Sequence, residues 1–339
     1  MIPAIARPLR WAGSARVAAC ALTLISGLSL AGGALANPSV WKSEWPNTDF
    51  TKKSVAFSEI LSGGPPKDGI PAIDSPKFLP VGKVAGLADT EPVITVSING
   101  DLRAYPLQVL IWHEIANDTV GGVPVAVTFC PLCNSALVFD RRVDGRVLDF
   151  GTTGKLRKSD LVMYDRQTES WWQQFLGEAI VGTMTGKRLK FIPVRIESFA
   201  RFKARGGTGK VLVPNGRFGR RYGANPYVGY DSRSAPYPFF RGKLPDKIPP
   251  LERVVVVGKE AWAFSLLRKK RRVESGDLVI TWESGQNSAL DTSVIARGRD
   301  VGNAVVRRRT AKGLVDAVHD VSFAFAFRAF YPDGRIHTE

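Results

Sequence analysis

From Val93 to Gln173 the chain consists of short runs of β-branched and aromatic residues that are separated by turn signals. Asn99-Gly100 is a pair typical of tight hairpins, and Gly121-Gly122 and Asp144-Gly145 separate further runs. We expect strands at 93–96, 123–129, 136–141, 147–150, 161–164 and 170–173. The pattern predicts a mainly β (α+β) fold of antiparallel sheets and hairpins, with a few short helices such as one over 106–115.

Two short matches indicate an internal duplication. Ala-Tyr-Pro-Leu at 104–107 resembles Ala-Phe-Ser-Leu at 263–266, and Asn-Ser-Ala-Leu at 134–137 recurs at 287–290. The matches keep their order at similar offsets, which predicts a degenerate β-rich repeat, although four-residue matches also arise by chance. In such a repeat Cys130 and Cys133 correspond to Glu283 and Gln286, so that only the first copy would carry thiols.

Glycine and proline divide the rest of the chain. Residues 37–92 are rich in Pro, Gly and Ser and predict an extended N-terminal arm. Residues 206–250 contain eight Gly and seven Pro in 45 residues, together with several Tyr, and predict either an aromatic flap or a rigid connector. The β-rich halves then cover 93–205, which holds the cysteine pair, and 251–339.

The first 36 residues have the layout of a secretory signal peptide. Arg7, Arg10 and Arg16 precede an uncharged run from Val17 to Leu35, and small residues lead to Asn37. Cleavage there would change the length from 339 to 339 − 36 = 303 residues and the charge from +16 to 16 − 3 = +13. We expect a periplasmic or extracellular protein with no transmembrane helix after cleavage; an uncleaved anchor is the alternative.

The charge of the chain does not indicate a specific partner. Hydrophobic residues make up 44% and charged residues 23% of the sequence, which excludes a disordered chain or a many-helix membrane protein. The basic clusters at 268–272 and 307–309 predict a solvated face, or contact with anionic envelope groups. Because export removes the chain from most nucleic acids, we expect no nucleic-acid partner but a small molecule or an envelope component.

The sharpest chemical signal is Cys130 and Cys133, which follow a predicted strand. Two Cys three residues apart can place both sulfurs on one side of a tight turn. Three interpretations follow: a metal site that needs further ligands, a redox dithiol whose first thiol has a lowered pKa, or a structural disulfide. The chain contains only three Cys, three Met and three His, so few side chains can complete a soft-metal site.

His113 is the histidine nearest to this pair in the sequence. His113-Glu114 begins like the helix motif of zinc proteases, but Asn117 stands where the second His is required, so that motif is excluded. Two thiolates and one imidazole would suit copper or zinc. We therefore expect Cys130, Cys133 and His113 to be both the metal ligands and the catalytic residues; a packing role for His113 is the alternative.

Polar side chains near these positions are candidates for supporting the site. Glu114 or Asp118 could orient the imidazole of His113. The dense polar and aromatic run at 159–173 is expected to pin a turn with ion pairs, and Trp171 and Trp172 are expected to point to opposite faces of a strand. The supporting residues are Glu114, Asp118, Tyr164, Asp165, Arg166 and Glu169.

The sequence resembles the domain-of-unknown-function 3179 family of bacteria and archaea. The matching blocks are 103–107, 113–118, 130–133, 139–141, Phe150-Gly151 with Gly154 and Leu156, and 160–170. The resemblance runs from about residue 71 to residue 336. Two departures are Asn134, where the family tends to have Gly, and 322–327, which is less Trp-rich. The resemblance supports the choice of site residues and implies no reaction.

Together these features predict an exported protein with a copper or zinc site, or a thiol-redox site, at Cys130, Cys133 and His113 beneath the flap. Whether it is an enzyme is left open. The alternative is a non-catalytic cell-envelope binding protein, in which the Cys pair is a structural disulfide and the Tyr-rich flap holds a carbohydrate or peptide. A third possibility, a dithiol oxidoreductase, requires an accessible and acidic Cys130 thiol.

Overall fold

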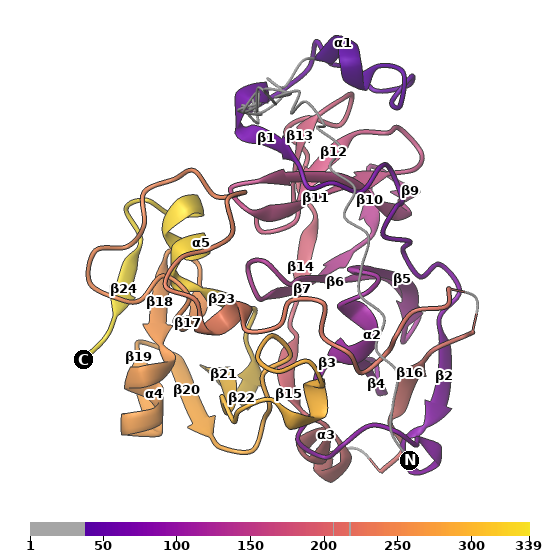
Figure 1. Cartoon of the computed structure of the whole chain (residues 1–339). Coiled ribbons are helices and arrows are strands. Elements are labelled where there is room, and N and C mark those ends of the chain that lie inside the picture. Colours follow the sequence, from indigo (N-terminus) through magenta and orange to yellow (C-terminus); the bar gives the residue numbers. More distant parts are fainter. Residues whose placement is uncertain (1–37, 206, 217) are drawn as a thin grey trace, which may run out of the picture. The chain divides into compact units, whose positions relative to one another are not determined.

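The computed structural model describes residues 38–205, 207–216 and 218–339, and the expected signal peptide at 1–36 lies outside these ranges. The described chain is mostly β, with small sheets and few short helices, which confirms the predicted fold class. Its five larger sheets form a five-bladed β-propeller arrangement, which the sequence patterns did not indicate (Figure 1). No helix within these ranges has the length and apolar character needed to cross a bilayer.

Three of the sheets are built by residues 60–213. In the order of hydrogen-bonded neighbours, the first contains β1 (Ile60–Ser62), β10 (Phe150–Arg157), β11 (Asp160–Asp165), β12 (Trp171–Gln173) and β13 (Glu178–Val181). The second, in the same order, contains β14 (Lys190–Ile192), β7 (Ser135–Asp140), β6 (Val123–Cys130) and β5 (Ile115–Val120). The third contains β15 (Arg195–Ser198), β3 (Pro92–Ile98), β4 (Asp101–Pro106), β16 (Lys210–Val213) and β2 (Lys77–Pro80).

The other two sheets are built by residues 253–337. One contains β23 (Asp320–Phe323), β17 (Arg253–Val257), β18 (Glu260–Ala263) and β24 (Arg335–His337). The other contains β19 (Arg272–Ser275), β20 (Leu278–Glu283), β21 (Asn303–Thr310) and β22 (Gly313–Asp316). A small ribbon pairs β8 (Arg142–Val143) with β9 (Arg146–Val147). The described strand pairs are antiparallel except β4 with β16 and β18 with β24.

The helices are short, and α2 and α4 connect strands of different sheets. The α-helices are α1 (Pro38–Trp41), α2 (Leu107–Leu110), α3 (Phe199–Arg205), α4 (Phe264–Lys270) and α5 (Ala324–Phe330). The 3-10 helices are η1 (Phe57–Glu59), η2 (Val81–Lys83), η3 (Tyr230–Ser232) and η4 (Ile295–Arg297). The helix expected over 106–115 is therefore shorter than predicted: α2 ends at Leu110, and the chain reverses at Glu114, whose φ is 58°, before it enters β5.

One order of elements occurs twice along the chain. A hairpin, a helix and a second hairpin form β3-β4-α2-β5-β6, and the same order forms β17-β18-α4-β19-β20 (Figure 1). Cys130 ends β6 and Glu283 ends β20, as the predicted repeat would align them. The second match differs, because Ser135 begins β7 whereas 287–290 lie in a loop. The duplication stays a prediction that the element order supports.

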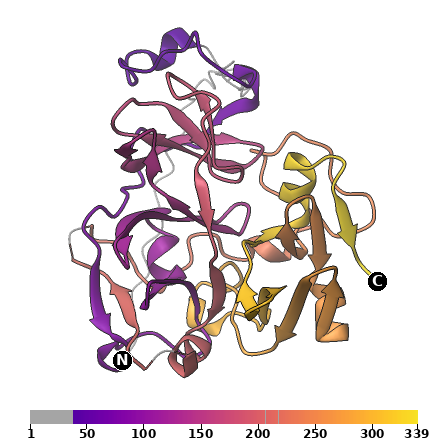
Figure 2. The ribbon, with the colours of Figure 1, turned by 180° about the vertical axis from the view of Figure 1, so that it is seen from behind.

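The segment before β3 adds strands to two sheets. β1 pairs with β10, and β2 pairs with β16. Trp45 is fully buried against Trp171, with ring centroids 5.3 Å apart, whereas Trp172 packs on Phe150 in the main core. The expected opposite directions of Trp171 and Trp172 are confirmed. β1 forms the edge of the sheet that carries both residues, and α1, in indigo, lies beside that sheet in both views (Figures 1 and 2).

Residues 206–250 are held against the body at several points. Their described residues form only two regular elements, β16 and η3. In η3, Asp231 pairs with Arg253 at 2.8 Å and with Arg299 at 2.9 Å, and the Tyr230 hydroxyl donates to the carbonyl of Leu132 at 2.9 Å. These buried contacts favour the rigid connector over a free flap.

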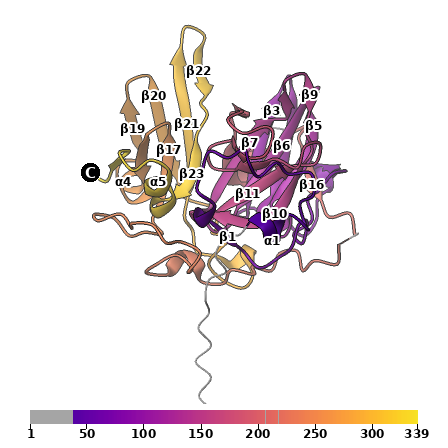
Figure 3. The same cartoon turned by 90° about the horizontal axis from the view of Figure 1, so that it is seen from above.

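Contacts also join the sheets of the two halves, which stand beside each other in Figure 3. The amide of Phe323 in β23 donates to the carbonyl of Cys133 at 2.9 Å. Arg195 in β15 pairs with Asp316 in β22 at 2.5 Å. The turn that carries the cysteines is therefore positioned by the second half of the chain as well as by its own sheet.

The two basic clusters pair partly with acids on the same sheet. Arg272 and Arg309 both pair with Glu274, and Arg308 pairs with Asp277. All of these side chains are exposed. This arrangement supports the interpretation of the clusters as a solvated face.

Candidate metal centre

The two cysteines lie on the turn between β6 and β7. Cys130 is the last residue of β6, and it pairs with Ser135 at the start of β7. Asn134 closes the turn with a φ of 53°, in the left-handed region that Gly and Asn adopt most easily. Its side chain donates to the carbonyl of Val321 at 2.9 Å. The turn is thus fixed in a conformation that brings both sulfurs to one side.

A second turn faces the first. Lys158 and Ser159 join β10 to β11 with φ values of 54° and 67°, so both central residues of this hairpin are left-handed. The turn directs the carbonyl oxygen of Ser159 toward the sulfurs, 3.4 Å from Cys133 Sγ and 3.8 Å from Cys130 Sγ. Left-handed backbone at non-glycine residues is strained, and it persists where the surrounding structure enforces it.

Asp160, the first residue of β11, completes a compact group with the two cysteines. One ligand atom each of Cys130, Cys133 and Asp160 lies within 4.8 Å of the others. Cys130 is 2% exposed, and Cys133 and Asp160 are 0% exposed. Two sulfurs and a carboxylate oxygen at this spacing can hold one metal ion.

The carboxylate of Asp160 is only partly satisfied by the protein. Its Oδ2 accepts hydrogen bonds from the Gln173 side chain at 2.5 Å and from the amide of Phe175 at 3.0 Å. Its Oδ1 is buried and has no hydrogen bond of good geometry, although both thiols lie close enough to lower the pKa of the carboxyl group. The Oδ1 atom is therefore the natural ligand atom of this residue.

Burial makes every acidic group of the site hard to ionise. Burial raises the pKa of Asp160 to about 7, against hydrogen bonds from Phe175 and Gln173 that lower it. It also raises the pKa of the Cys130 thiol, and the charge of Asp160 adds to this effect. The pKa of Cys133 is raised well above its ordinary value by burial and then by its contact with Cys130. Without a cation, the two thiols hold their protons at neutral pH, and Asp160 keeps its proton to a much greater extent than an exposed carboxyl group.

Two further carboxyl groups belong to the same buried region. Burial and then the charge of Asp160 raise the pKa of Glu114 to about 8. Burial also raises the pKa of Asp320 in β23 to about 7, and Asp160 contributes to this shift. Within the described ranges, no Lys or Arg forms a hydrogen bond or ion pair with Glu114, Asp160 or Asp320. Buried acids without a basic partner are expected where a cation binds.

The structure does not place His113 in this group. Its Nδ1 lies 2.7 Å from the carbonyl oxygen of Pro71, and its Nε2 lies 2.9 Å from the hydroxyl of Tyr222. Burial lowers the pKa of the ring. Both ring nitrogens therefore lie at hydrogen-bond distance from other groups, one in the N-terminal arm and one in the 206–250 loop. Asp160, rather than the expected His113, lies beside the sulfurs.

The residues expected to support the site lie in different places. Glu114 is near the group, since its charge raises the pKa of Cys130. Asp118 does not orient His113, because its carboxylate accepts hydrogen bonds from Arg103 and Tyr105. Among the described hydrogen bonds and ion pairs, the other four have none to the cysteines and instead bind the N-terminal arm, their own turn or β12: Tyr164 to Asp68, Asp165 to Thr168 and Trp172, Arg166 to Asp74, and Glu169 to Lys67 and Asn47.

Asp160 and Ser159 are the site residues that sequence reasoning missed. Asp160 begins one of the blocks that resemble the family, but it lies 27 residues beyond Cys133, and such a separation carries no metal-ligand signature. One signal was available in the sequence: an acidic residue stands directly before the apolar residues 161–163. A carboxylate that is buried with such a run is expected to have a partner there. The role of Ser159 depends on a backbone carbonyl, which no side-chain pattern reveals.

The cysteines are free thiols in the structure, so the disulfide of the binding-protein alternative is not formed. A dithiol oxidoreductase needs an exposed first thiol with a lowered pKa. Cys130 instead is buried, and its pKa is raised. This geometry favours metal binding over thiol exchange.

The comparisons with known proteins give a family and no activity. The family model described as "Protein of unknown function (DUF3179)" matches residues 67–334, which is most of the chain, so the protein belongs to this family. Neither the curated proteins nor the solved structures contain a match. Function must therefore be argued from the site itself.

Proposed function

We propose that this family member is a zinc-binding protein whose buried centre is formed by Cys130, Cys133 and Asp160. The observation that carries the proposal is the enclosure of these acidic ligand atoms within 4.8 Å of one another. Burying several acids together is unfavourable because they can neither ionise nor be hydrated. A divalent cation removes this cost by replacing the protons of the thiols and the carboxyl group.

The ligand set favours zinc over copper. Thiolates bind both metals, but Cu(I) prefers thiolate and thioether sulfur alone, whereas zinc also accepts carboxylate oxygen. Asp160 supplies that oxygen, and the imidazole of His113 is engaged by Pro71 and Tyr222. Of the two metals expected from the sequence, zinc therefore fits this ligand set better than copper.

The carbonyl oxygen of Ser159 is the best candidate for a fourth ligand. It already faces both sulfurs, and it belongs to the same turn as Asp160. Four protein ligands would give a closed tetrahedral centre of the kind that stabilises a fold. Glu114 lies close by with its raised pKa, and it would give up its proton more readily once a cation neutralises the site.

Zinc titration against a competing chelator in a reducing buffer tests the proposal. We expect one zinc per chain for the wild type. A Cys130→Ser/Cys133→Ser variant and an Asp160→Asn variant should each bind at least roughly 100-fold more weakly, since loss of a direct ligand should cost no less than loss of an outer partner.

A His113→Gln variant serves as the matched control, because it removes the imidazole that was expected to bind but leaves the three ligands in place. It should retain wild-type zinc affinity, with circular dichroism confirming that every variant is folded. Equal zinc affinity in the wild type and the folded Asp160→Asn variant would contradict the proposal, as would loss of zinc from a folded His113→Gln variant.

We also propose that the protein is exported, on the basis of the charged, apolar and small-residue segments before Asn37. Mass spectrometry of protein recovered from the source cell envelope should give an N-terminus at Asn37. Recovery of the intact chain only from the cytoplasm would exclude export.

A further inference from the structure

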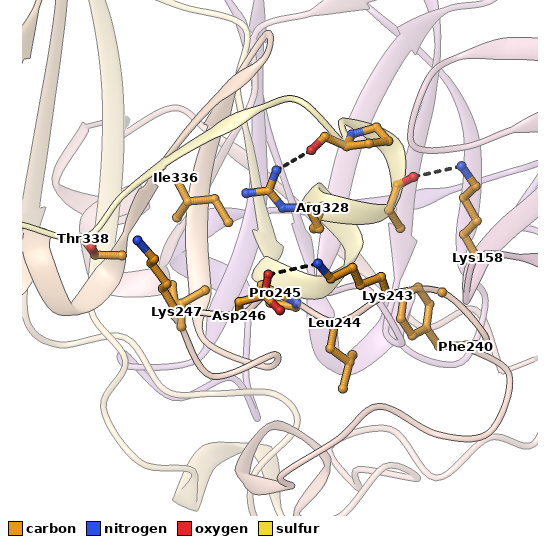
Figure 4. Close-up of a pocket in the computed structure, with 14 residues that line it drawn as sticks. Lys158, Phe240, Lys243, Leu244, Pro245, Asp246, Lys247, Arg328, Ile336 and Thr338 are labelled. Carbon is orange, nitrogen blue, oxygen red and sulfur yellow. Dashed lines mark hydrogen bonds and ion pairs between the residues drawn. The ribbon is translucent and has the colours of Figure 1, made fainter.

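A cavity of about 580 Å³ lies apart from the cysteines, between α5, β24 and the end of the 206–250 loop. Figure 4 shows its walls. Its volume is within the range of sites for small organic molecules, roughly 300–1,000 Å³. Of the described residues that line the cavity, Lys158 is the one next to the metal centre in sequence, because it directly precedes Ser159.

The charges around the cavity are mostly positive. Lys158, Lys243, Lys247 and Arg328 line it, and Asp246 is its single acidic residue among those described. Asp246 pairs with Lys243 at 3.1 Å (Figure 4), and no acid in the described part of the chain forms an ion pair with Lys158, Lys247 or Arg328.

Hydrogen bonds to neutral backbone groups position two of these cations. Lys158 donates from Nζ to the carbonyl of Ala329 at 2.8 Å, and Arg328 donates to the carbonyl of Gly334 at 3.0 Å. Neutral carbonyls fix the directions of these side chains but leave their positive charge uncompensated. The side chain of Lys247 forms no ion pair with any described residue, and it remains available to a ligand.

The rest of the wall is largely apolar. It is formed by Phe240, Leu244, Pro245, Ile248 and Ile336. Phe240 packs edge-on against Phe325 of α5, with ring centroids 4.9 Å apart, and so joins the loop to the core. Apolar walls with a few placed charges fix both the affinity and the orientation of a ligand.

We propose that this cavity binds a small organic anion, with its phosphate or carboxylate group at Lys247 and Arg328 and its apolar body against Phe240 and Leu244. Cations without acidic partners complement an anionic group, and the apolar wall favours an organic anion over a bare inorganic ion. The proposal does not depend on zinc, because no thiol lines the cavity.

Isothermal titration calorimetry with phenyl phosphate and benzoate tests the proposal, with inorganic phosphate and benzyl alcohol as the anion-only and apolar-only probes. We expect at least one of the two organic anions to bind at least about tenfold more tightly than either partial probe, since charged hydrogen bonds and apolar burial both contribute. No binding of either organic anion, or equal binding of inorganic phosphate, would overturn the proposal.

Variants locate the binding. Lys247→Gln and Arg328→Gln should each weaken binding of the organic anion by about tenfold. Lys269→Gln, which removes a charge in α4 outside the cavity, should leave it unchanged. The Cys130→Ser/Cys133→Ser variant should also bind normally, which separates this proposal from the zinc proposal. Equal affinity in Lys247→Gln, Lys269→Gln and the wild type would place the ligand elsewhere.

Discussion

At the scale of single residues, the proposed metal centre depends on the backbone conformation of residues beside the ligands as well as on the ligand side chains. Asn134 and Ser159 both adopt positive φ, one beside each ligand-bearing segment. Asn is among the few residues that tolerate this conformation, so Asn134 can stand where the family tends to have Gly. The departure from the family pattern therefore preserves the turn that presents the sulfurs.

The raised pKa values give the metal-free protein an unusual dependence on pH. The pKa of Asp160 rises from 3.8 to about 7 and that of Glu114 from 4.5 to about 8 on folding. Between the ordinary and the raised pKa, the folded state holds protons that the unfolded chain has released, so stability falls as pH rises toward the raised value. We expect the melting temperature of chelator-treated protein to fall between about pH 6.5 and about pH 8, and this decline to level off above that pH.

Above pH 6.5 the loss of stability comes from the buried acids and not from the histidines. The pKa values of His113, His319 and His337 are lowered, chiefly by burial, so their contribution is lost only as pH falls below their ordinary value of 6.5. Saturating zinc should remove the decline above that value, because metal binding favours the deprotonated ligands. An Asp160→Asn variant should show a smaller decline without zinc. A melting temperature that rises with pH in the metal-free wild type would contradict the raised pKa values.

At the scale of elements, two segments far apart in sequence hold the cysteine turn. Tyr230 of η3 donates to the carbonyl of Leu132, and Phe323 of β23 donates to that of Cys133. Asp231, the next residue in η3, forms a buried ion pair with Arg253 of β17. The 206–250 loop therefore links the turn to the second half of the chain.

Asp231→Asn should destabilise the protein by about 3 kcal/mol, since it leaves the buried guanidinium of Arg253 without its counter-charge. The matched control is Asp246→Asn, which breaks a pair whose side chains are 79% and 72% exposed and should change stability by less than about 0.5 kcal/mol. Urea unfolding followed by tryptophan fluorescence measures both. Similar effects of the two substitutions would show that the η3 contact is not structural.

The N-terminal arm should contribute to stability through a single large side chain. Trp45 is 0% exposed and packs on Trp171 and Tyr164, with ring centroids 5.3 Å and 4.8 Å away. Trp45→Ala should therefore destabilise the protein by about 3 kcal/mol or more. Val40→Ala, at a position that is 68% exposed, should have little effect in the same urea titration. A Trp45→Ala protein as stable as the wild type would mean that the arm is not docked in solution.

At the scale of the whole molecule, local patterns predicted much more of the strand content than of the arrangement. Asn99-Gly100 specifies a hairpin through its own backbone preferences, and β3 and β4 pair there. The propeller arrangement and the pairing of β1 with β10 depend on contacts between distant segments, which periodicity does not encode.

The same division applies to the candidate site. The spacing of Cys130 and Cys133 predicted two neighbouring thiols, because the chain between them is too short to separate them. His113 was expected as the third ligand, but the structure places Asp160 beside the thiols, since scarcity of histidine does not indicate where an imidazole points. Asp160 comes to the thiols through the β10–β11 hairpin, which belongs to a different sheet from theirs. Only the packing of those two sheets brings the three residues together.

Zinc K-edge X-ray absorption spectroscopy of the zinc-loaded full-length protein tests the proposed centre most directly. We expect two sulfur ligands at about 2.3 Å and oxygen ligands at about 2.0–2.2 Å, without the multiple-scattering signal of an imidazole. A first shell of nitrogen and oxygen alone, or a clear imidazole contribution, would show that zinc binds somewhere other than Cys130, Cys133 and Asp160.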